Sequence, residues 1–428
     1  MERQMNSMQE PIKIALIGAG FRGMKYGEYA HKSLKAMKIV AVADLDEAKR
    51  AKARERFDIA EDRCYQDWDE FFAQPKDADA VFICTRDRDH FEPAIKALKA
   101  GYHVLLEKPM SPDWRECIEL GKAAEEANRA LTICHVLRYS PFFQTIKKLL
   151  VSGRIGRLMS IQHNENVAYW HQAHSFVRGY FSRAEDSSPM ILAKSCHDLD
   201  LIRWFADAKC TSVASYGHLS YFRPEHAPKG APKYCIEGCP VEDTCVYYAP
   251  DTYMIENGGW KAQAASADPS YEARYKAMQE GPFGRCVFQC DNDVVDHQVV
   301  AMEFENAVTA VFTMSAFTEK SNRTLKLMGT IGEIRASMET NEIEIRTFGS
   351  GKLETIRLVD PEGHIGHGGG DKRLIEDFGV TVRSFGTHHS ATAASVSVES
   401  HLMAFASERS RVEKRMVRLD EFTLEEDL

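Results

Sequence analysis

The 428-residue sequence lacks three features: a long apolar run, an excess of basic charge and an apolar segment near its first residue. Without about 18 consecutive apolar residues, no membrane-spanning helix is expected. The 54 basic and 63 acidic residues are mixed along the chain and give a net charge of −9. This argues against a nucleic-acid-binding surface, which would concentrate Lys and Arg. The first ten residues, MERQMNSMQE, lack the apolar core of a signal peptide, so we expect a cytoplasmic protein.

The sequence does contain enough apolar material for a large globular fold. Hydrophobic residues make up 44% of the chain and charged residues 27%, values typical of globular proteins. A chain of this length is too long for one compact core, so we expect two domains. We predict one domain over residues 1–136 and a second over residues 137–428, because the pattern of strands changes between them.

The first 136 residues alternate short apolar runs with helical patterns. The apolar runs are IKIALIG (12–18), IVAVAD (39–44), ADAVFICT (78–85), HVLLE (103–107) and LTICHV (131–136). Strands that alternate with helices form a parallel sheet covered on both faces. The first domain is therefore predicted to be α/β.

The second domain has a different pattern, with strands joined by short turns such as MGTIGE from Val294 onward. Short turns join antiparallel strands, so we predict an α+β domain with a large open, mainly antiparallel sheet. An open sheet needs a cover, and we expect its exposed face to form a homodimer or homotetramer. Residues 223–290 contain a cysteine-rich insertion, which we predict to be loop-like and without its own core.

The motif GAGFRG follows the first predicted strand and begins a helix. It consists of Gly18, Gly20 and Gly23, with Phe21 and Arg22 between the last two glycines. The first glycine permits a tight turn, the second lets a pyrophosphate approach the backbone, and the third allows close helix–strand packing. This context predicts a Rossmann domain that binds a dinucleotide.

Asp44 at the end of the second predicted strand indicates which dinucleotide is bound. An acidic side chain there accepts the ribose hydroxyls and repels a 2′-phosphate, so we predict NAD, with NADP less favoured. Lys49 and Arg50 lie close enough in sequence to weaken the exclusion of NADP. As an alternative or additional role, Asp44 could cap the helix that follows it.

A further segment makes the chain resemble a known family. CTRDRDHFEPAIKALKAGYHVLLEKP (84–109) is similar to the signature of the Gfo/Idh/MocA oxidoreductases, which include glucose–fructose oxidoreductase and inositol dehydrogenase. The resemblance extends over nearly the whole chain and leaves out only the cysteine-rich insertion. It implies an NAD-dependent oxidoreductase with a small carbohydrate as its substrate.

The resemblance also implies roles for residues of this segment. Thr85, Arg86 and His90 would lie along the cofactor near the nicotinamide ribose, although the family usually has proline in place of Arg86. Glu107 would lie at the nicotinamide end, and Lys108 beside the reacting carbon, followed by a proline that is often in the cis form. From there Lys108 could hydrogen-bond the substrate hydroxyl.

The stretch MILAKSCHDLDLIRWF (190–205) departs from the family pattern. The family usually carries an aspartate four residues before a histidine that accepts the hydroxyl proton; His197 matches the histidine, but Ala193 replaces the aspartate. We predict Lys108, His197 and Lys194 as the catalytic residues. On one helix face Lys194 would lower the pKa of His197 and keep it neutral; alternatively, it only pairs with Asp198.

Candidate substrate ligands lie in three segments. YWHQAHSFVRGYF (169–181) contains His171, His174 and Arg178 among aromatic residues, a composition that suits a sugar ring. A histidine pair could also bind metal, but no third ligand is near in sequence. His367 lies in GHIGHGGGD (363–371), a glycine-rich stretch that could close over a ligand or could equally be an ordinary loop. Tyr139 resembles a family residue near the nicotinamide.

Five cysteines are clustered around the insertion. Cys235, Cys239 and Cys245 lie within eleven residues, and Cys286 is our choice of fourth ligand, with Cys290 as the alternative. Four thiolates fit a structural zinc site, and an iron–sulfur cluster uses the same ligands. Unrelated free thiols are the remaining explanation. We expect zinc, because clustered cysteines in a reducing compartment commonly bind metal.

Together these features predict an NAD-dependent oxidoreductase that takes a hydride from a secondary hydroxyl of a sugar, glycoside or cyclitol. Oxidation of a glycoside at ring position 3 is the preferred reaction, because the insertion and the aromatic–histidine segment indicate a substrate larger than a monosaccharide. Two alternatives stay open: a redox-neutral NAD-dependent glycosidase, and an NAD-binding sensor without catalysis. No nucleic-acid or membrane partner is expected.

Overall fold

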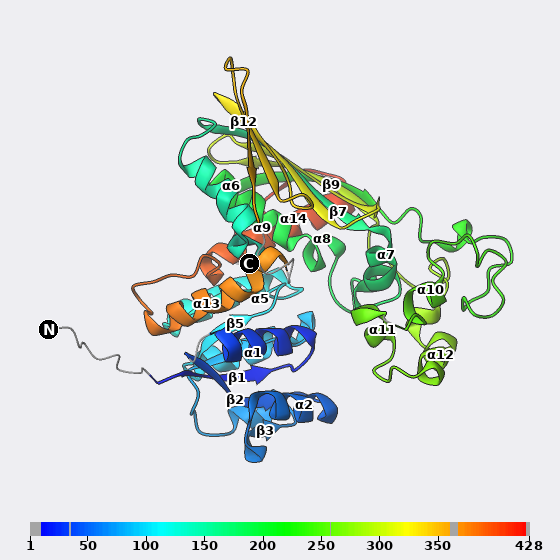
Figure 1. Ribbon diagram of the computed structural model, residues 1–428. Coiled ribbons are helices and arrows are strands. Elements are labelled where there is room, and N and C mark those ends of the chain that lie inside the picture. Colours follow the sequence, from blue (N-terminus) through cyan, green and yellow to red (C-terminus); the bar gives the residue numbers. More distant parts are fainter. Residues whose placement is uncertain (1–9, 34–35, 257, 360–366, 425–428) are drawn as a thin grey trace.

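The computed structural model describes residues 10–33, 36–256, 258–359 and 367–424, which form two sheets with helices between them (Figure 1). The first sheet lies at the bottom of the view and the second at the top, where its long strands extend away from the first. No helix in these four ranges combines the length and apolar character needed to cross a membrane.

The first sheet has six strands, all parallel, in the order β3-β2-β1-β4-β5-β6. Its strands are β1 (Ile12–Ile17), β2 (Met37–Ala43), β3 (Cys64–Tyr65), β4 (Ala80–Ile83), β5 (His103–Leu106) and β6 (Leu131–Ile133). The central strand β4 is buried at every residue, because helices cover both faces. The strand order reverses between β1 and β4, and ligands of such sheets bind at that point, beyond the carboxyl ends of the strands.

The helices of this layer come from both ends of the chain. They are α1 (Phe21–Ser33), α2 (Glu47–Phe57), α3 (Trp68–Phe72), α4 (Phe91–Lys99), α5 (Trp114–Glu126) and α13 (Gly370–Arg383). Helix α13 packs beside α1, and its Phe378 ring contacts Phe82 of β4 at 5.7 Å between centroids. A late segment thus completes the core of the first sheet, so the domain division at residue 136 stays a prediction.

The second sheet has nine strands in the order β14-β13-β12-β11-β7-β10-β9-β8-β15. Its strands are β7 (Leu158–Ala168), β8 (Cys210–His218), β9 (His297–Phe304), β10 (Thr309–Thr318), β11 (Asn322–Gly329), β12 (Gly332–Ser337), β13 (Glu342–Thr347), β14 (Leu353–Arg357) and β15 (Val417–Arg418). Every neighbouring pair is antiparallel except β7 with β10. The predicted fold class, a Rossmann domain plus an α+β domain with a mainly antiparallel sheet, is confirmed.

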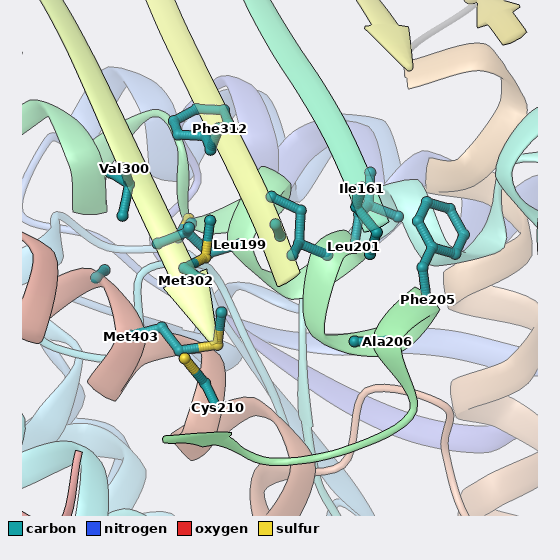
Figure 2. Packing of buried hydrophobic residues seen from close by; sticks show 14 of the residues in the cluster. Ile161, Leu199, Leu201, Phe205, Ala206, Cys210, Val300, Met302, Phe312 and Met403 are labelled. Carbon is teal, nitrogen blue, oxygen red and sulfur yellow. The ribbon is translucent and has the colours of Figure 1, made fainter. Parts of the chain in front are cut away.

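One face of this sheet packs against helices. These are α6 (Pro141–Val151), α8 (Met190–Ala193), α9 (Cys196–Ala206), α14 (Ala394–Glu413) and α15 (Asp420–Leu424). Strand side chains alternate between the two faces, so β9 buries every second residue. Figure 2 shows Leu199 and Leu201 of α9 beside Met302 and Phe312 of the sheet, with Met403 of α14 closing the cluster. This packing fixes α9, and with it His197, over the end of the first sheet.

The insertion lies to one side of the second sheet, next to α7 (Tyr169–His171) (Figure 1). It contains the short helices α10 (Ala249–Tyr253), α11 (Gly259–Ala265) and α12 (Tyr271–Glu280). Tyr253, Met278 and Phe288 are buried in a separate apolar cluster, which Val177 joins from outside the insertion. The prediction that the insertion lacks a core was therefore wrong: its aromatic residues supply one.

Candidate active site

A cavity of about 790 Å³ opens at the carboxyl ends of the strands of the first sheet. One wall consists of the glycine loop after β1 and the residues that follow β2, β4 and β5. The other wall comes from the second half of the chain: the segment after β7, the α8–α9 turn, strand β11 and His367. We call the part near Asp44 the cofactor end and the part near His197 the substrate end.

The loop after β1 depends on its glycines. Gly18 has φ +85°, and a Cβ there would lie 2.6 Å from the Cys84 carbonyl oxygen. A Cβ on Gly23 would lie 2.0 Å from the Gly18 oxygen, whereas one on Gly20 would meet nothing within 4 Å. The backbone at Gly20 is thus open toward the cavity, with the amino end of α1 behind it. These residues fit the pyrophosphate of a dinucleotide.

Asp44 lines the cofactor end, where its carboxylate is held by two backbone amides. The Ala19 N–H donates to Oδ2 at 2.8 Å and the Asp46 N–H to Oδ1 at 2.9 Å. Helix α2 is capped by Asp46, which accepts from the N–H groups of Ala48 and Lys49. Asp44 is therefore not the helix cap, and that alternative was wrong. Lys49 lines the cavity and pairs with Asp46 at 3.5 Å.

Glu107 is buried between cations. Its Oε1 accepts from Arg22 Nε at 2.8 Å and from the Tyr26 hydroxyl at 2.7 Å. Burial opposes its ionisation, but Arg22 and Lys108 outweigh burial, and the pKa of Glu107 is lowered. Arg22 also pairs with Asp371 at 2.8 Å. Arg22 and Glu107 thus join α1, the turn after β5 and α13 at the middle of the cavity.

Thr85, Arg86 and His90 all line the cavity after β4. The buried His90 ring contacts the Pro109 carbonyl oxygen at 2.7 Å and the Thr85 oxygen at 3.3 Å. It therefore ties the Thr85 loop to the Lys108–Pro109 turn, whose peptide bond is cis. Arg86, where the family usually has proline, stacks over the Tyr180 ring at 4.7 Å.

Lys108 and His197 meet at the substrate end. Lys108 Nζ donates to the Ala193 carbonyl oxygen at 2.8 Å, so the residue that replaces the family aspartate holds Lys108 through its backbone. The His197 ring lies between His135 and His367, each 5.7 Å away between centroids. Burial lowers the pKa of His197 well below its usual value, and the cation that adds most is Lys108, not Lys194 as predicted.

Lys194 lines the substrate end but does not share a helix face with His197. Helix α8 ends at Ala193 and α9 begins at Cys196, so Lys194 lies in the turn between them. Its Nζ lies 3.2 Å from Glu165 Oε1. Asp198 instead accepts from Arg323 Nε and contacts His163 Nε2, both at 2.7 Å. The proposed Lys194–Asp198 pair was therefore wrong.

Two of the predicted substrate ligands line the cavity. His171 does so from α7, and burial lowers its pKa well below the usual value, with Lys194 adding to the effect. His367 does so after β14, and its Nδ1 lies 3.0 Å from Asp371 Oδ1. Their positions agree with a role at the substrate, which stays a prediction.

His174 and Arg178 do not line the cavity; they hold the insertion instead. Arg178 donates to the carbonyl oxygens of Arg285 and Tyr247, both at 2.7 Å. The His174 ring stacks on Phe283 at 4.9 Å between centroids. His174 lies in the π-helical segment Gln172–Val177 and Arg178 directly follows it, and both side chains contact the insertion. Their prediction as substrate ligands was wrong.

Tyr139 also lies outside the cavity. It is buried, and its hydroxyl donates to Asp377 Oδ2 at 2.9 Å and contacts Ser390 at 2.8 Å. Its role is to join the chain after β6 to α13 and the segment before α14. The prediction of Tyr139 as a substrate ligand was wrong.

Arg323 is the residue at the substrate end that the sequence reasoning missed. It lies on β11 and lines the cavity, while Glu165 on β7 and Asp198 on α9 pair with it from behind. The sequence did indicate an inward position for this side chain. Side chains alternate between the two faces of a strand, and in NRTLKL Arg323 is on the same face as the buried Leu325 and Leu327. A charge on the inward face of a strand requires partners, and here it has two carboxylates.

The clustered cysteines do not form the predicted metal site. Within the residues described, no group of three or more His, Cys, Asp or Glu side chains is arranged to hold a metal ion. Cys235 Sγ lies 3.7 Å from Arg178 Nη2, and Cys290 Sγ donates to the Cys286 oxygen at 3.3 Å. Burial raises the pKa of Cys290 to about 11 and also raises that of Cys245 and Cys286. The structure therefore gives no support to zinc or iron–sulfur ligation by Cys235, Cys239, Cys245 and Cys286.

Two family models match this chain over most of its length. An oxidoreductase family, NAD-binding Rossmann fold, matches residues 12–135, and its C-terminal alpha/beta domain matches residues 147–364. Both are models of the Gfo/Idh/MocA family. The first match covers all six strands of the first sheet, and the second covers β7 to β14 of the second sheet.

Individual relatives are more distant. The chain is 27% identical to the putative oxidoreductase YteT of Bacillus subtilis over 70% of this chain and 71% of that one. It is 28% identical to inositol 2-dehydrogenase 4 of Saccharopolyspora erythraea over 47% of this chain and only 56% of that one.

Solved structures share the fold along nearly the whole chain. A levoglucosan dehydrogenase in complex with NADH and levoglucosan has a TM-score of 0.70 at 17% identity, covering 96% of this chain and 99% of that one. A myo-inositol 2-dehydrogenase from Lactobacillus plantarum has a TM-score of 0.65 at 18% identity, covering 95% and 99%.

Proposed function

This chain belongs to the Gfo/Idh/MocA family of NAD-binding oxidoreductases, and we propose that it oxidises a secondary hydroxyl of a sugar, glycoside or cyclitol. The observation that carries the proposal is the meeting of Lys108 and His197 at one end of a cavity whose other end fits a dinucleotide. The names of the relatives, which include inositol and levoglucosan dehydrogenases, support a carbohydrate substrate.

In this proposal the glycine loop after β1 and Asp44 would hold NAD, which would supply the acceptor for the hydride of the carbinol carbon. The hydroxyl proton leaves in the same reaction and needs a base. His197 is this base, and it accepts the proton at Nε2. Its other ring nitrogen, Nδ1, is buried and has no hydrogen-bond partner among the described residues. Its lowered pKa keeps the ring neutral and able to accept a proton at physiological pH. Lys108 donates a hydrogen bond to the hydroxyl oxygen and orients it.

We propose NAD in preference to NADP because of Asp44. Two backbone amides fix the orientation of its carboxylate at the cofactor end, where it would accept the ribose hydroxyls. A 2′-phosphate would meet the Asp44 carboxylate. The cations nearby are Lys49, which lines the cavity, and Arg50, whose Nη1 donates to the Asp44 carbonyl oxygen at 2.6 Å.

We favour a glycoside oxidised at ring position 3, because the wall that carries His171 borders the insertion. Trp260 of α11 lies 6.4 Å from the His171 ring, and Phe176 and Phe181 line the cavity beside them. Aromatic faces suit a sugar ring, and Trp260 brings the insertion next to this wall.

We also propose that the outer face of the second sheet joins copies of the chain in a homodimer or homotetramer. On that face Tyr216 is 72% exposed, and Val299 and Phe317 are exposed beside it. Size-exclusion chromatography with light scattering at two protein concentrations tests this, and a monomer at both would exclude it.

The proposed function is tested by incubating the purified protein with NAD and a panel of substrates. The panel holds free sugars, myo-inositol, levoglucosan, and α- and β-glycosides, and both NADH absorbance and product mass are followed. NADH together with a product two mass units lighter is expected. Aglycone release without NADH would instead indicate the redox-neutral glycosidase. Binding of NAD with no turnover of any compound would leave the sensor as the better explanation.

A further inference from the structure

The substrate end of the cavity presents cations, while the carboxylates that pair with them lie behind its wall. Lys194 and Arg323 line the cavity, with side chains 18% and 10% exposed. Glu165 and Asp198 are 1% and 0% exposed and do not line it. A bound molecule would therefore meet the positive ends of these pairs first.

The cations at this end differ in how closely they are paired. Glu165 is shared by Lys194 at 3.2 Å and Arg323 at 2.7 Å, and Asp198 pairs with Arg323 at 2.7 Å, so two cations meet two carboxylates. Lys108 adds a third cation, and its Nζ contacts a carbonyl oxygen instead of a carboxylate. The nearby carboxylate Glu107 is already paired with Arg22. Asp87 also lines the cavity, and the charge of Lys108 acts on it, so Lys108 has a carboxylate nearby as well. What this end offers a ligand is therefore a set of unused hydrogen-bond donors.

The cations also have hydrogen-bond donors to spare. A lysine ammonium has three donors and an arginine guanidinium five. Among the described residues, Lys194 has one ion-pair partner, Glu165, and Arg323 uses Nε and Nη2 while no hydrogen bond uses Nη1. Arg323 and Lys194 meet at the same carboxylate, so their remaining donors lie near one another. A pair of this kind suits the two oxygens of a ligand carboxylate.

We infer that the substrate carries a carboxylate, as a uronic acid or a glycoside of one does, and that Lys194 and Arg323 bind it. This inference rests on the proposed function and names its substrate class. Lys194 and Arg323 already share carboxylate partners, so the pair suits one negative charge with two oxygens better than a phosphate dianion. The replacement of the family aspartate by Ala193 fits as well, because an acid there would repel the ligand.

The test compares matched pairs of compounds that differ in the carboxylate. The pairs are D-glucuronate with D-glucose, D-galacturonate with D-galactose, and methyl β-D-glucuronide with methyl β-D-glucoside; D-glucose 6-phosphate is the phosphate arm. Binding to the NADH-loaded protein is followed by NADH fluorescence, and turnover by NADH formation with NAD. We expect at least one carboxylate to bind about tenfold or more tightly than its neutral partner, since hydrogen bonds to charged groups have this strength.

Three variants assign the preference to this wall. Lys194→Met should reduce the carboxylate preference about tenfold, whereas Lys194→Arg should keep most of it because the charge remains. Lys326→Met is the matched control: Lys326 lies on the same strand as Arg323 but faces away from the cavity and pairs with Glu333 at 3.2 Å. It should leave the preference unchanged.

The outcomes separate this inference from the proposed function. If neutral sugars are oxidised and no carboxylate is preferred, the inference is wrong and the oxidoreductase proposal stands. If a carboxylate is preferred in binding but nothing is oxidised, the inference stands and the proposed reaction is wrong. Preference for the phosphate, or a carboxylate preference that Lys194→Met does not change, would also overturn the inference.

Discussion

The two ends of the cavity are built in different ways. At the cofactor end, Gly18, Gly20, Gly23 and Asp44 come from adjacent strand–helix units of one parallel sheet. At the substrate end, the lining cations come from β11, from the α8–α9 turn and, with Lys108, from the turn after β5. The first site is formed within one short stretch of chain, whereas the second exists only after two sheets have packed together.

The two ends also differ in charge. Asp44, Asp46 and Asp67 line the cofactor end together with Lys49. Lys108, Lys194 and Arg323 line the substrate end, with Asp87 near Lys108. A cofactor site of standard geometry accepts one kind of ligand, so its residues can be identified from a motif. A substrate site varies with the ligand, and its residues are recognised only by which side chains the fold brings together.

The largest expected effect is at the substrate end, from Lys108→Met. Removing the ammonium that orients the hydroxyl should lower kcat by about 10³-fold, within the range for a lost acid–base or positioning group. The contact of Nζ with the Ala193 oxygen at 2.8 Å contributes little to cofactor binding. The dissociation constant of NADH, from fluorescence titration, should therefore change by less than about threefold. An unchanged kcat with a measurable NADH affinity would remove Lys108 from the chemistry.

The sequence predicted the fold class and the glycine loop because both depend on local patterns. Alternating strands and helices specify a parallel sheet, and Gly18 and Gly23 are positions where a side chain would collide with backbone. The Lys108–Pro109 turn and His197 were found through resemblance to a family. The other residues at the substrate end could not be found through this resemblance, because the sequence departs from the family pattern at Ala193.

The errors concern what tertiary packing does to individual side chains. Tyr139, His174 and Arg178 have the chemistry of substrate ligands, but the direction of a side chain is set by distant packing, and these three join α13 or the insertion to the rest. Arg323 was missed for the opposite reason, because a strand arginine is usually a surface residue. The cysteines were close in sequence, but among the described residues no group of three or more of them is arranged to hold a metal ion.

The next largest effect is on stability at low pH, and it comes from histidines behind the substrate end. Burial lowers the pKa of His135 to about 4 and that of His401 to about 3. In the unfolded chain these histidines are protonated below about pH 6.5, whereas in the folded protein they stay neutral until a much lower pH. Their neutral burial therefore costs no stability above pH 6.5, and the free energy of unfolding falls as the pH drops from 6.5 toward 4. For His135 the loss reaches about 3 kcal/mol at pH 4.

This pH effect is checked by the melting temperature between pH 7.5 and 4.5 for the parent protein and His135→Phe. Neither ring nitrogen of His135 has a hydrogen-bond partner among the described residues, so an apolar ring leaves no new buried group unpaired. The variant should lose less stability on acidification than the parent. Equal slopes would mean that His135 is protonated in the folded protein, contrary to the effect of burial.

The cofactor end gives a smaller and more specific effect through Asp44→Asn. Losing the charge should weaken NAD binding about tenfold, as expected when charged hydrogen bonds to the ribose become neutral, and should raise the affinity for NADP. Asp46→Asn is the matched control, since Asp46 caps α2 and pairs with Lys49 but does not hold the Ala19 amide. It should change the NAD-to-NADP ratio by less than about threefold. A similar change in both variants would show that net charge, not the position of Asp44, determines the preference.

The smallest effect on catalysis is expected from Tyr139→Phe. This variant tests whether a residue outside the cavity contributes to substrate binding. The Tyr139 hydroxyl bonds Asp377 at 2.9 Å and Ser390 at 2.8 Å, outside the cavity, so its loss should lower the free energy of unfolding by about 1 kcal/mol. It should leave kcat/KM within about twofold, because no substrate contact is lost. His171→Ala, in the cavity wall, is the contrasting variant and should raise KM clearly. If Tyr139→Phe lowered kcat/KM as much as His171→Ala did, Tyr139 would reach the substrate. The residues that line the cavity would then not be the only ones that contact it.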